Sequence, residues 1–429
     1  MKEPWVNAGE LSAGGDCFFH KTNTLKIMKH FLLMITLATV LPLAAAETEH
    51  PDALTLGDTV SVPDTHLLLT VVEDSTGTVG ASISISEQVK QKYLTSLTDI
   101  TIPETIEIPR QGWTQTFKVI SLEANALSNL TYLKTLTIPS TVTNIHQNAC
   151  SNNPNLTAVK ISGGEPQIGQ IGNSAFEGCT SLAEFPADQN LSSIGEKAFS
   201  GCSSLKTINA GSRLTWIGSN AFENSGLTTF DLTGATHIYL APYAFANATN
   251  LESITFHENL TALQSNTFQN CTSLKNVDLS QTNIGYVGSS AFDGCSAVET
   301  VSLPASVGHI DSKAFGGCEK ISTINIAATQ APSLAADAFP ESVFSNPNLV
   351  INYPEGSEAS YTNPYGSWSK FKVLSDETVG ISQISAEAAS APVEYFTTTG
   401  QRVAEPVPGM LLIRRQGPSA VKVIYNSSK

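Results

Sequence analysis

Five cysteines recur at a fixed distance from a repeated phenylalanine, and a cysteine thiol can bind a metal ion or form a disulfide. Each follows its phenylalanine by three residues: Cys179, Cys202, Cys271, Cys295 and Cys318. A metal site would need convergent histidines or C-x-x-C pairs, and the sequence has neither. Disulfides remain open, because equivalent positions of stacked parallel strands lie about 4.8 Å apart. Other copies hold Asn153, Ser225 and Ala248 in this slot, which favours small buried side chains and free thiols.

Histidines, serines and acidic residues do not form a catalytic pattern. The motif H-E-x-x-H is absent, and His146 and His309 adjoin apolar repeat positions, where a surface or spacer role is expected. The strings G-S-N-A-F and G-S-S-A-F lack the G-x-S-x-G nucleophile pattern. No P-loop, G-x-G-x-x-G or EF-hand-like loop occurs, and no carboxylate pair stands out. The sequence therefore predicts a protein that is not an enzyme and that holds no metal and no cofactor.

The overall composition is that of a folded, acidic protein. The chain has 429 residues, a formal net charge of −15, 41% hydrophobic residues and 14% charged residues. The apolar fraction is too high for a disordered acidic tail. The negative balance argues against nucleic acid as a partner and against docking on anionic membranes.

An Ala-Phe dipeptide or a close variant recurs through the middle of the chain. Its second positions, called the repeat positions below, are Leu127, Cys150, Phe176, Phe199, Phe222, Phe245, Phe268, Phe292, Phe315 and Phe339. Most steps between them are 23 residues long, and none is shorter than 23 or longer than 26. Such regular spacing is the signature of a solenoid, in which each unit stacks on its neighbours.

Each unit contains one short apolar pattern, L-x-x-I-x-L, such as Leu274, Val277 and Leu279. Its last residues alternate with a period of two, which predicts one short strand per coil. A single coil buries too little apolar surface to offset its conformational entropy, so it folds only within a stack. Ten coils at about 4.8 Å per parallel strand predict a solenoid roughly 48 Å long. A strand with an irregular or short helical return in 23 residues is typical of leucine-rich repeats.

The repeat resembles the BspA-like class of leucine-rich repeats. The motif I-G-x-x-A-F-x-G-C-x-S-L-x-x-I-x-L appears in IGNSAFEGCTSLAEF (171–185) and in IGEKAFSGCSSLKTI (194–208). The resemblance covers residues 95–374, because the stretch 328–374 is similar to the family's closing repeat and cap. The sequence departs from the motif at Cys150, where Phe is expected, and at Ser225-Gly226, where one residue is missing. The resemblance implies a surface protein of Bacteroidetes-type bacteria with a leucine-rich repeat solenoid.

The chain divides into six segments on these patterns. They are a leader at 1–27, a signal peptide at 28–46, a β-rich N-terminal cap at 47–122, the solenoid with its C-terminal cap at 123–374, a linker at 375–391 and a small C-terminal β module at 392–429. The signal peptide has a basic start, an apolar run from Phe31 to Leu43 and an Ala-x-Ala site before Glu47. A separate small β-sandwich is the alternative for 47–122.

The C-terminal module carries the strings Y-F-x-x-x-G-Q-R-V and P-G-M-L-L-I-R-R. They are similar to a short module of secreted and surface proteins from Bacteroidetes-like bacteria. In some of those proteins a related module is a sorting signal for export, and in others it is present without that role. Both readings stay open for this copy.

The x positions of the strand pattern point out of the core and form the candidate binding face. We call these residues the strand face: Thr207, Asn209, Thr229, Asp231, Ser253, Thr255, Asn276, Asp278, Thr300, Ser302, Thr323 and Asn325. One reading is structural, because stacked hydroxyls and amides on an exposed parallel sheet satisfy one another. The other is a docking surface, since solenoids bind partners on such faces. Few aromatic residues project there.

These observations predict a secreted or cell-surface binding protein, adhesin-like, monomeric and without a membrane-spanning segment in its mature chain. The expected partner is a protein or another cell-surface macromolecule, which the family resemblance extends to host matrix proteins. The alternative is glycan binding or an accessory role in carbohydrate scavenging, which the strand face and secretion favour and the lack of stacking aromatics weakens. Cell surface and periplasm are both open as the final location.

Overall fold

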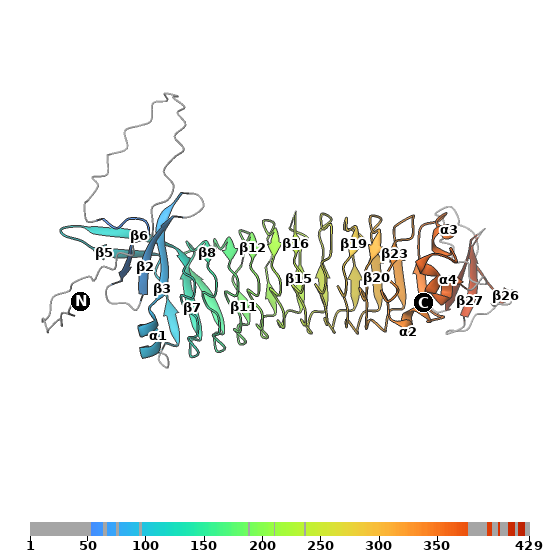
Figure 1. The fold of residues 1–429 in the computed structure, drawn as a ribbon, viewed down its shortest axis with the longest axis horizontal. Helices are drawn as coiled ribbons and strands as arrows, with labels where there is room; N and C mark the ends of the chain where they lie inside the picture. The colour runs from blue at the N-terminus through green and yellow to red at the C-terminus, as the bar shows by residue number, and fades with distance from the viewer. Residues whose placement is uncertain are drawn as a thin grey trace, which may run out of the picture.

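The computed structural model describes residues 53–375, except 63–66, 74–76, 94–96, 188, 210 and 236, together with four strands between residues 393 and 424. The expected leader at 1–27, the signal peptide at 28–46 and, beyond Ser375, the linker lie outside the described residues. The described chain forms an elongated parallel β-solenoid of about ten turns, with about 23 residues per coil (Figure 1). The predicted leucine-rich repeat fold is confirmed.

One series of parallel strands follows the L-x-x-I-x-L pattern. It comprises β4 (Asp99–Thr101), β7 (Thr135–Pro139), β9 (Ala158–Ser162), β11 (Glu184–Phe185), β13 (Thr207–Ile208), β15 (Thr229–Asp231), β17 (Ser253–Thr255), β18 (Asn276–Asp278), β20 (Thr300–Leu303), β22 (Thr323–Ile326) and β24 (Val350–Asn352). The ladder pairing is interrupted between β13 and β15 and between β17 and β18. In every strand of the array an inward apolar residue alternates with outward residues, as the period of two predicts.

A second series of strands lies on the opposite edge of the solenoid in Figure 1 and was not predicted. It comprises β6 (Thr114–Leu122), β8 (Asn144–Ile145), β10 (Gln170–Ile171), β12 (Ser193–Ile194), β14 (Trp216–Ile217), β16 (Tyr239–Leu240), β19 (Tyr286–Val287), β21 (His309–Ile310) and β23 (Ser333–Leu334). Most are two residues long, with the first facing outward and the second buried. Two residues are too few for alternation to be visible in a sequence, so the pattern indicated only one strand per coil.

The repeat phenylalanines form a continuous stack through the core. From Phe176 to Phe339, eight rings follow one another with centroids 4.8 to 5.5 Å apart and nearly parallel planes. From Leu127 to Phe315, the backbone N–H at each repeat position donates to a carbonyl of the next coil. The acceptor lies one residue before the next repeat position, as Ala244 does for Phe222 at 2.8 Å. The dipeptide therefore joins neighbouring coils through both its side chain and its backbone.

The two departures from the repeat motif are accommodated locally. Cys150 takes the place of the phenylalanine and is fully buried. At Ser225-Gly226 the shortened turn brings the backbone against the preceding coil, where a Cβ on Gly226 would lie 2.1 Å from the Ser203 carbonyl oxygen. Only glycine fits such an approach. The first strand series is interrupted at this coil, between β13 and β15.

The N-terminal cap extends the second strand series rather than forming a separate sandwich. Its further elements are β1 (Thr59–Ser61), β2 (Leu67–Glu73), β3 (Val79–Ile85), β5 (Thr105–Pro109) and the helix α1 (Glu87–Tyr93). The sheet order β1-β2-β3-β6-β8 runs from the cap directly into the solenoid. Neighbouring strands thus cover the open edge of the first coil.

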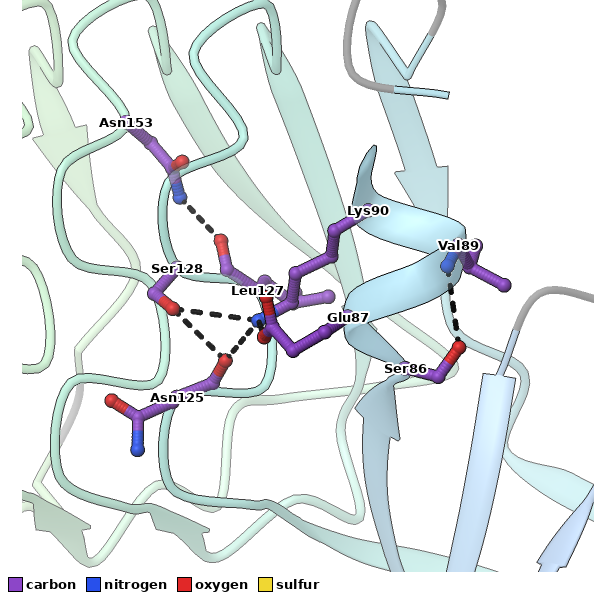
Figure 2. Close-up of polar contacts among 8 residues, drawn as sticks. All are labelled: Ser86, Glu87, Val89, Lys90, Asn125, Leu127, Ser128 and Asn153. Carbon is purple, nitrogen blue, oxygen red and sulfur yellow. Dashed lines mark hydrogen bonds and ion pairs between the residues drawn. The ribbon is translucent and has the colours of Figure 1, made fainter. Parts of the chain in front are cut away.

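The Lys90 side chain of α1 packs against the turn of the first coil that contains Asn125 and Ser128 (Figure 2). Its ammonium group donates to the Asn125 carbonyl oxygen at 2.6 Å and pairs with the Glu87 carboxylate at 2.9 Å. The Ser128 hydroxyl lies 3.4 Å away, and the lysine is only 5% exposed. A lysine is rarely buried unless it is paired, so these contacts place it as a cap on backbone that has no preceding coil to bond.

The C-terminal cap closes the last coil with aromatic and basic side chains. Its elements are α2 (Glu341–Phe344), α3 (Glu358–Tyr361), η1 (Ser367–Lys370) and α4 (Lys372–Ser375). The Tyr361 hydroxyl donates to the Ala328 carbonyl at 2.7 Å, and the Trp368 indole N–H donates to the Pro332 carbonyl at 2.6 Å. Both rings are almost fully buried. They cover the apolar end of the stack while satisfying its last carbonyls.

The described strands of the C-terminal module form a small antiparallel sheet. Its order is β26-β25-β27-β28, from β25 (Val393–Phe396), β26 (Arg402–Val403), β27 (Leu411–Gln416) and β28 (Ser419–Ile424). Within the part of the chain that the structure describes, no helix is both long enough and apolar enough to cross a bilayer.

Replacing one ring of the phenylalanine stack tests how far the array depends on it. We expect Phe222→Ala to lower the free energy of unfolding by about 3–5 kcal/mol, because it leaves a cavity between two stacked rings. Urea unfolding followed by circular dichroism measures the change. The control is Tyr132→Ala, whose side chain is 48% exposed. Equal losses in both variants would contradict the role of the stack.

Removing the ammonium group of the N-terminal cap tests its function. We expect Lys90→Met to lower the free energy of unfolding by about 1–3 kcal/mol, because the Asn125 carbonyl loses a charged donor and keeps only the neutral donors of Ser128. Gln91→Met, at an exposed position of the same helix, is the matched control. Hydrogen exchange should show the loss first in residues 123–130, and protection unchanged there would rule out the capping role.

Candidate functional site

The strand face is brought together as the sequence predicts, in three stretches. Register pairs align Thr229 with Ser253 and Asp231 with Thr255 in the middle stretch. In the last stretch Asn276, Thr300 and Thr323 form one row, and Asp278, Ser302 and Asn325 form the next. Thr207 lies in β13 and Asn209 just beyond its end, on the far side of the first interruption. The residues from Thr207 to Asp278 are exposed, and the four after them are half-buried.

Side chains on the strand face bond to one another across coils. The Thr255 hydroxyl donates to the Asp231 carboxylate at 2.9 Å. The Asn325 amide donates to the Ser302 hydroxyl at 3.1 Å, and the Asn352 amide donates to Asn325 at 2.8 Å. These contacts support the structural reading of the face, and they also hold its side chains in fixed positions.

Asp231 contributes a fixed negative charge to this face. The Thr233 backbone N–H donates to its carboxylate at 2.9 Å, and the Thr255 hydroxyl donates to the same oxygen. The Thr233 hydrogen bond, with that of Thr255, lowers the pKa of the Asp231 carboxyl below its usual value. The group therefore stays ionised throughout the physiological range.

The six described cysteines, Cys150 and the five at the slot, are free and buried. At each slot cysteine the thiol donates to the carbonyl of the previous coil's repeat position, as Cys202 does to Phe176 at 3.2 Å. Asn153 makes the same contact to Leu127 with its amide, at 2.8 Å. The five slot cysteines and Asn153 thus combine small size with a donated hydrogen bond, whereas Ser225 and Ala248 fill the slot without one. Neither the metal nor the disulfide reading fits this geometry.

Burial shields these thiols from solvent and raises the pKa of several of them. It raises the pKa of the Cys179 thiol to about 12. Burial likewise raises the pKa of the Cys202 and Cys271 thiols well above the usual value. Since the thiolate is the reactive form, Cys179, Cys202 and Cys271 act as packing groups at neutral pH.

A row of outward side chains on the second strand series was missed by sequence reasoning. We call it the second row: Asn144, Gln170, Ser193, Trp216, Tyr239, Ala262, Tyr286, His309 and Ser333. Its members lie six residues before successive repeat positions, and this constant offset is the signal that could have found them. Trp216 and Tyr239 are 46% and 40% exposed and stack with centroids 4.6 Å apart. Aromatic residues are therefore few on the strand face but present on the second row.

Three residues near the end of the second row resemble a hydrolytic triad. The Nδ1 atom of His309 lies 2.5 Å from the Ser333 hydroxyl oxygen, and its Nε2 atom lies 2.7 Å from the Asp311 carboxylate. The Ser333 hydroxyl donates to the Gly308 carbonyl at 3.1 Å, so its proton is engaged with the backbone rather than with the imidazole. The His309 side chain is 46% exposed, and water would compete at every atom of the group. These contacts fit a surface ion pair, not a nucleophile.

Metal binding finds no support among the described residues, where no three His, Cys, Asp or Glu side chains gather as ligands. The strand face and the second row are two polar surfaces that recur from coil to coil, both on the outside of a packed core. Such surfaces can bind a partner by contact, and they offer no enclosed, dry centre for a reaction.

Comparison with known proteins identifies the repeat. The family model described as BspA type leucine rich repeat region matches six copies, over residues 91–228, 169–283 and 215–349. No curated protein matches the sequence.

Three solved structures are similar to the chain. A leucine rich cell surface protein from Faecalibacterium prausnitzii is 20% identical, covers 69% of this chain and 96% of its own, and has a TM-score of 0.36. The pneumococcal vaccine antigen PcpA is 16% identical, with coverages of 71% and 95% and a TM-score of 0.33. A leucine-rich repeat protein from Bacteroides ovatus is 18% identical, with coverages of 67% and 75% and a TM-score of 0.35.

Thiol titration tests the free state of the cysteines. We expect a thiol reagent to react with none of the six described cysteines, Cys150 to Cys318, in the native protein, because all are buried. After unfolding without reductant, all six should react. Failure to detect free thiols in the unfolded protein would show that neighbouring slots are joined by disulfides.

Proposed function

The chain belongs to the BspA-type leucine-rich repeat family, and from that premise we propose that it is a non-catalytic binding protein of the cell surface, adhesin-like in its action. Its partner is a protein or another macromolecule exposed on a cell or in host matrix. The observation that carries the proposal is the strand face, where side-chain hydrogen bonds hold polar groups in register across successive coils.

The dimensions of the strand series suit a protein partner. Ten strands from β7 to β24 make nine coil-to-coil steps, roughly 43 Å at the usual strand spacing. With the adjoining turns, a surface of that length can supply the roughly 800 Å² that each partner contributes to a standard interface. Because neighbouring coils share a packed core, the face is rigid before binding, and little entropy is lost on association.

Charge restricts the class of partner further. Asp231 and Asp278 project from the strand face, and the whole chain carries a formal charge of −15. A partner with basic or neutral polar groups is favoured, and anionic polymers are disfavoured. The protein acts as a monomer in this proposal, since one chain supplies the whole face.

Substitutions on the strand face test the proposal. We expect Thr229→Arg and Asn276→Arg to weaken binding to the recognised matrix or surface protein at least about tenfold, because each places a long cation in the centre of the face. Thr249→Arg, on an exposed turn, is the matched control. Biolayer interferometry against a panel of purified matrix and cell-surface proteins provides the measurement. Binding by no panel member, or equal binding by all three variants, would argue against the strand face as the site.

Location is tested on intact cells that produce the protein. We expect added protease to degrade it while a periplasmic marker in the same cells remains intact. Protection of the protein until the outer membrane is opened would instead assign it to the periplasm.

A further inference from the structure

The aromatic part of the second row forms a second candidate surface, separate from the strand face. Trp216 and Tyr239 occupy neighbouring coils, and Tyr286 follows two coils later, with Ala262 between them. Large aromatic side chains left this exposed next to one another often mark a recognition site. Some side chains on the strand face bond to one another across coils, whereas this part of the row presents stacked rings to solvent.

The stacking direction leaves one ring face of Tyr239 turned towards Ala262. The planes of Trp216 and Tyr239 differ by 14°, with centroids 4.6 Å apart, which is close to the spacing between coils. The planes of the two rings are therefore roughly perpendicular to the direction of the row. The face of Tyr239 that does not contact Trp216 is directed to the next coil. Ala262 offers only a methyl group there, and the position of Tyr286 lies two steps from Tyr239, roughly 9.6 Å.

The polar groups beside Ala262 are uncharged. The Gln264 amide, two residues along the same coil, donates to the Tyr286 hydroxyl at 3.0 Å. From Asn144 to Tyr286 the second row contains amides, a hydroxyl, aromatic rings and one methyl group, with no formal charge, although the chain as a whole is acidic. This combination suits a neutral ligand that carries hydroxyl groups.

We propose that this surface binds a neutral glycan, with one pyranose ring seated over Ala262. The apolar C–H face of the sugar packs against the open face of Tyr239, because aromatic faces are electron-rich and C–H groups carry partial positive charge. Gln264 and the Tyr286 hydroxyl bind the sugar hydroxyls. The site is distinct from the strand face and does not depend on the function proposed for it.

Size favours a glycan over a protein at this surface. Four coils from Trp216 to Tyr286 span roughly 14 Å, and strands of two residues are about 7 Å long. The resulting area is on the order of 100 Å², far below the roughly 800 Å² of a standard protein partner. A short stretch of sugar chain matches it.

Filling the position of Ala262 provides the sharpest test. Tyrosine is the residue that the repeat already holds at Tyr239 and Tyr286, so Ala262→Tyr should fold while occupying the proposed sugar position. Tyr239→Ala removes the stacking face. Ser193→Tyr is the matched control, because it adds a ring on the other side of Trp216 and leaves Ala262 unchanged. Affinity electrophoresis of the full mature chain in a β-glucan, a galactomannan and an arabinoxylan, with alginate as an anionic comparison, measures binding.

We expect at least one of the neutral polysaccharides to retard the wild-type protein. Ala262→Tyr and Tyr239→Ala should weaken that binding about 30-fold or more, while Ser193→Tyr leaves it unchanged. The proposal is overturned if none of the three neutral polysaccharides binds, if alginate alone binds, or if Ala262→Tyr binds as well as wild type. Loss of a protein partner in the same variants, without neutral glycan binding, would assign the row to a protein contact instead.

Discussion

The spacing between coils is the constraint on which the rest of the structure depends. Stacked phenylalanine rings from Phe176 to Phe339, and the backbone hydrogen bonds of the same dipeptide, hold neighbouring coils about 5 Å apart. A single coil has neither a second ring to contact nor a carbonyl to accept its N–H. Stability therefore belongs to pairs of coils, and the two ends need caps that replace the missing neighbour. Lys90 supplies a cation at one end, and Tyr361 and Trp368 supply ring donors at the other.

The same spacing determines what the surface can do. A position at a fixed number of residues from the repeat position recurs in every coil. The side chains at such equivalent positions therefore form a row along the solenoid, in which neighbours are close enough to touch. On the strand face the rows are built of short polar groups, which form hydrogen bonds across coils. On the second row they include rings, which stack instead. The buried cysteine slot follows the same rule in the core, where each thiol donates to the coil before it.

The fold could be predicted from the sequence because its determinants are periodic. The repeat phenylalanines, the strand pattern and the small residues at the cysteine slot recur often enough to identify the solenoid and the strand face. The second strand series could not be found this way, since its strands are mostly two residues long and show no alternation. Cap contacts such as Lys90 with Asn125 join residues 35 positions apart and occur once, so no repeat signals them. The second row was missed for a related reason. Its residues lie on the second strand series, and without those strands the sequence does not show that their side chains point outward.

The strand face and the second row also differ in how many of their side-chain groups already contact one another within the protein. On the strand face, the Thr255 hydroxyl is bonded to Asp231 and the Asn325 amide to Ser302, so a ligand that binds these groups exchanges one hydrogen bond for another. Such exchange favours a broad partner that gathers many weak contacts along the array. On the second row, Ala262 lies between Tyr239 and Tyr286 and has no ring of its own. A ligand placed there would contact the Tyr239 ring without disturbing the stacking of Tyr239 on Trp216. In the two proposals, a small ring-shaped ligand therefore needs one point of the solenoid, whereas a partner of the strand face needs its length.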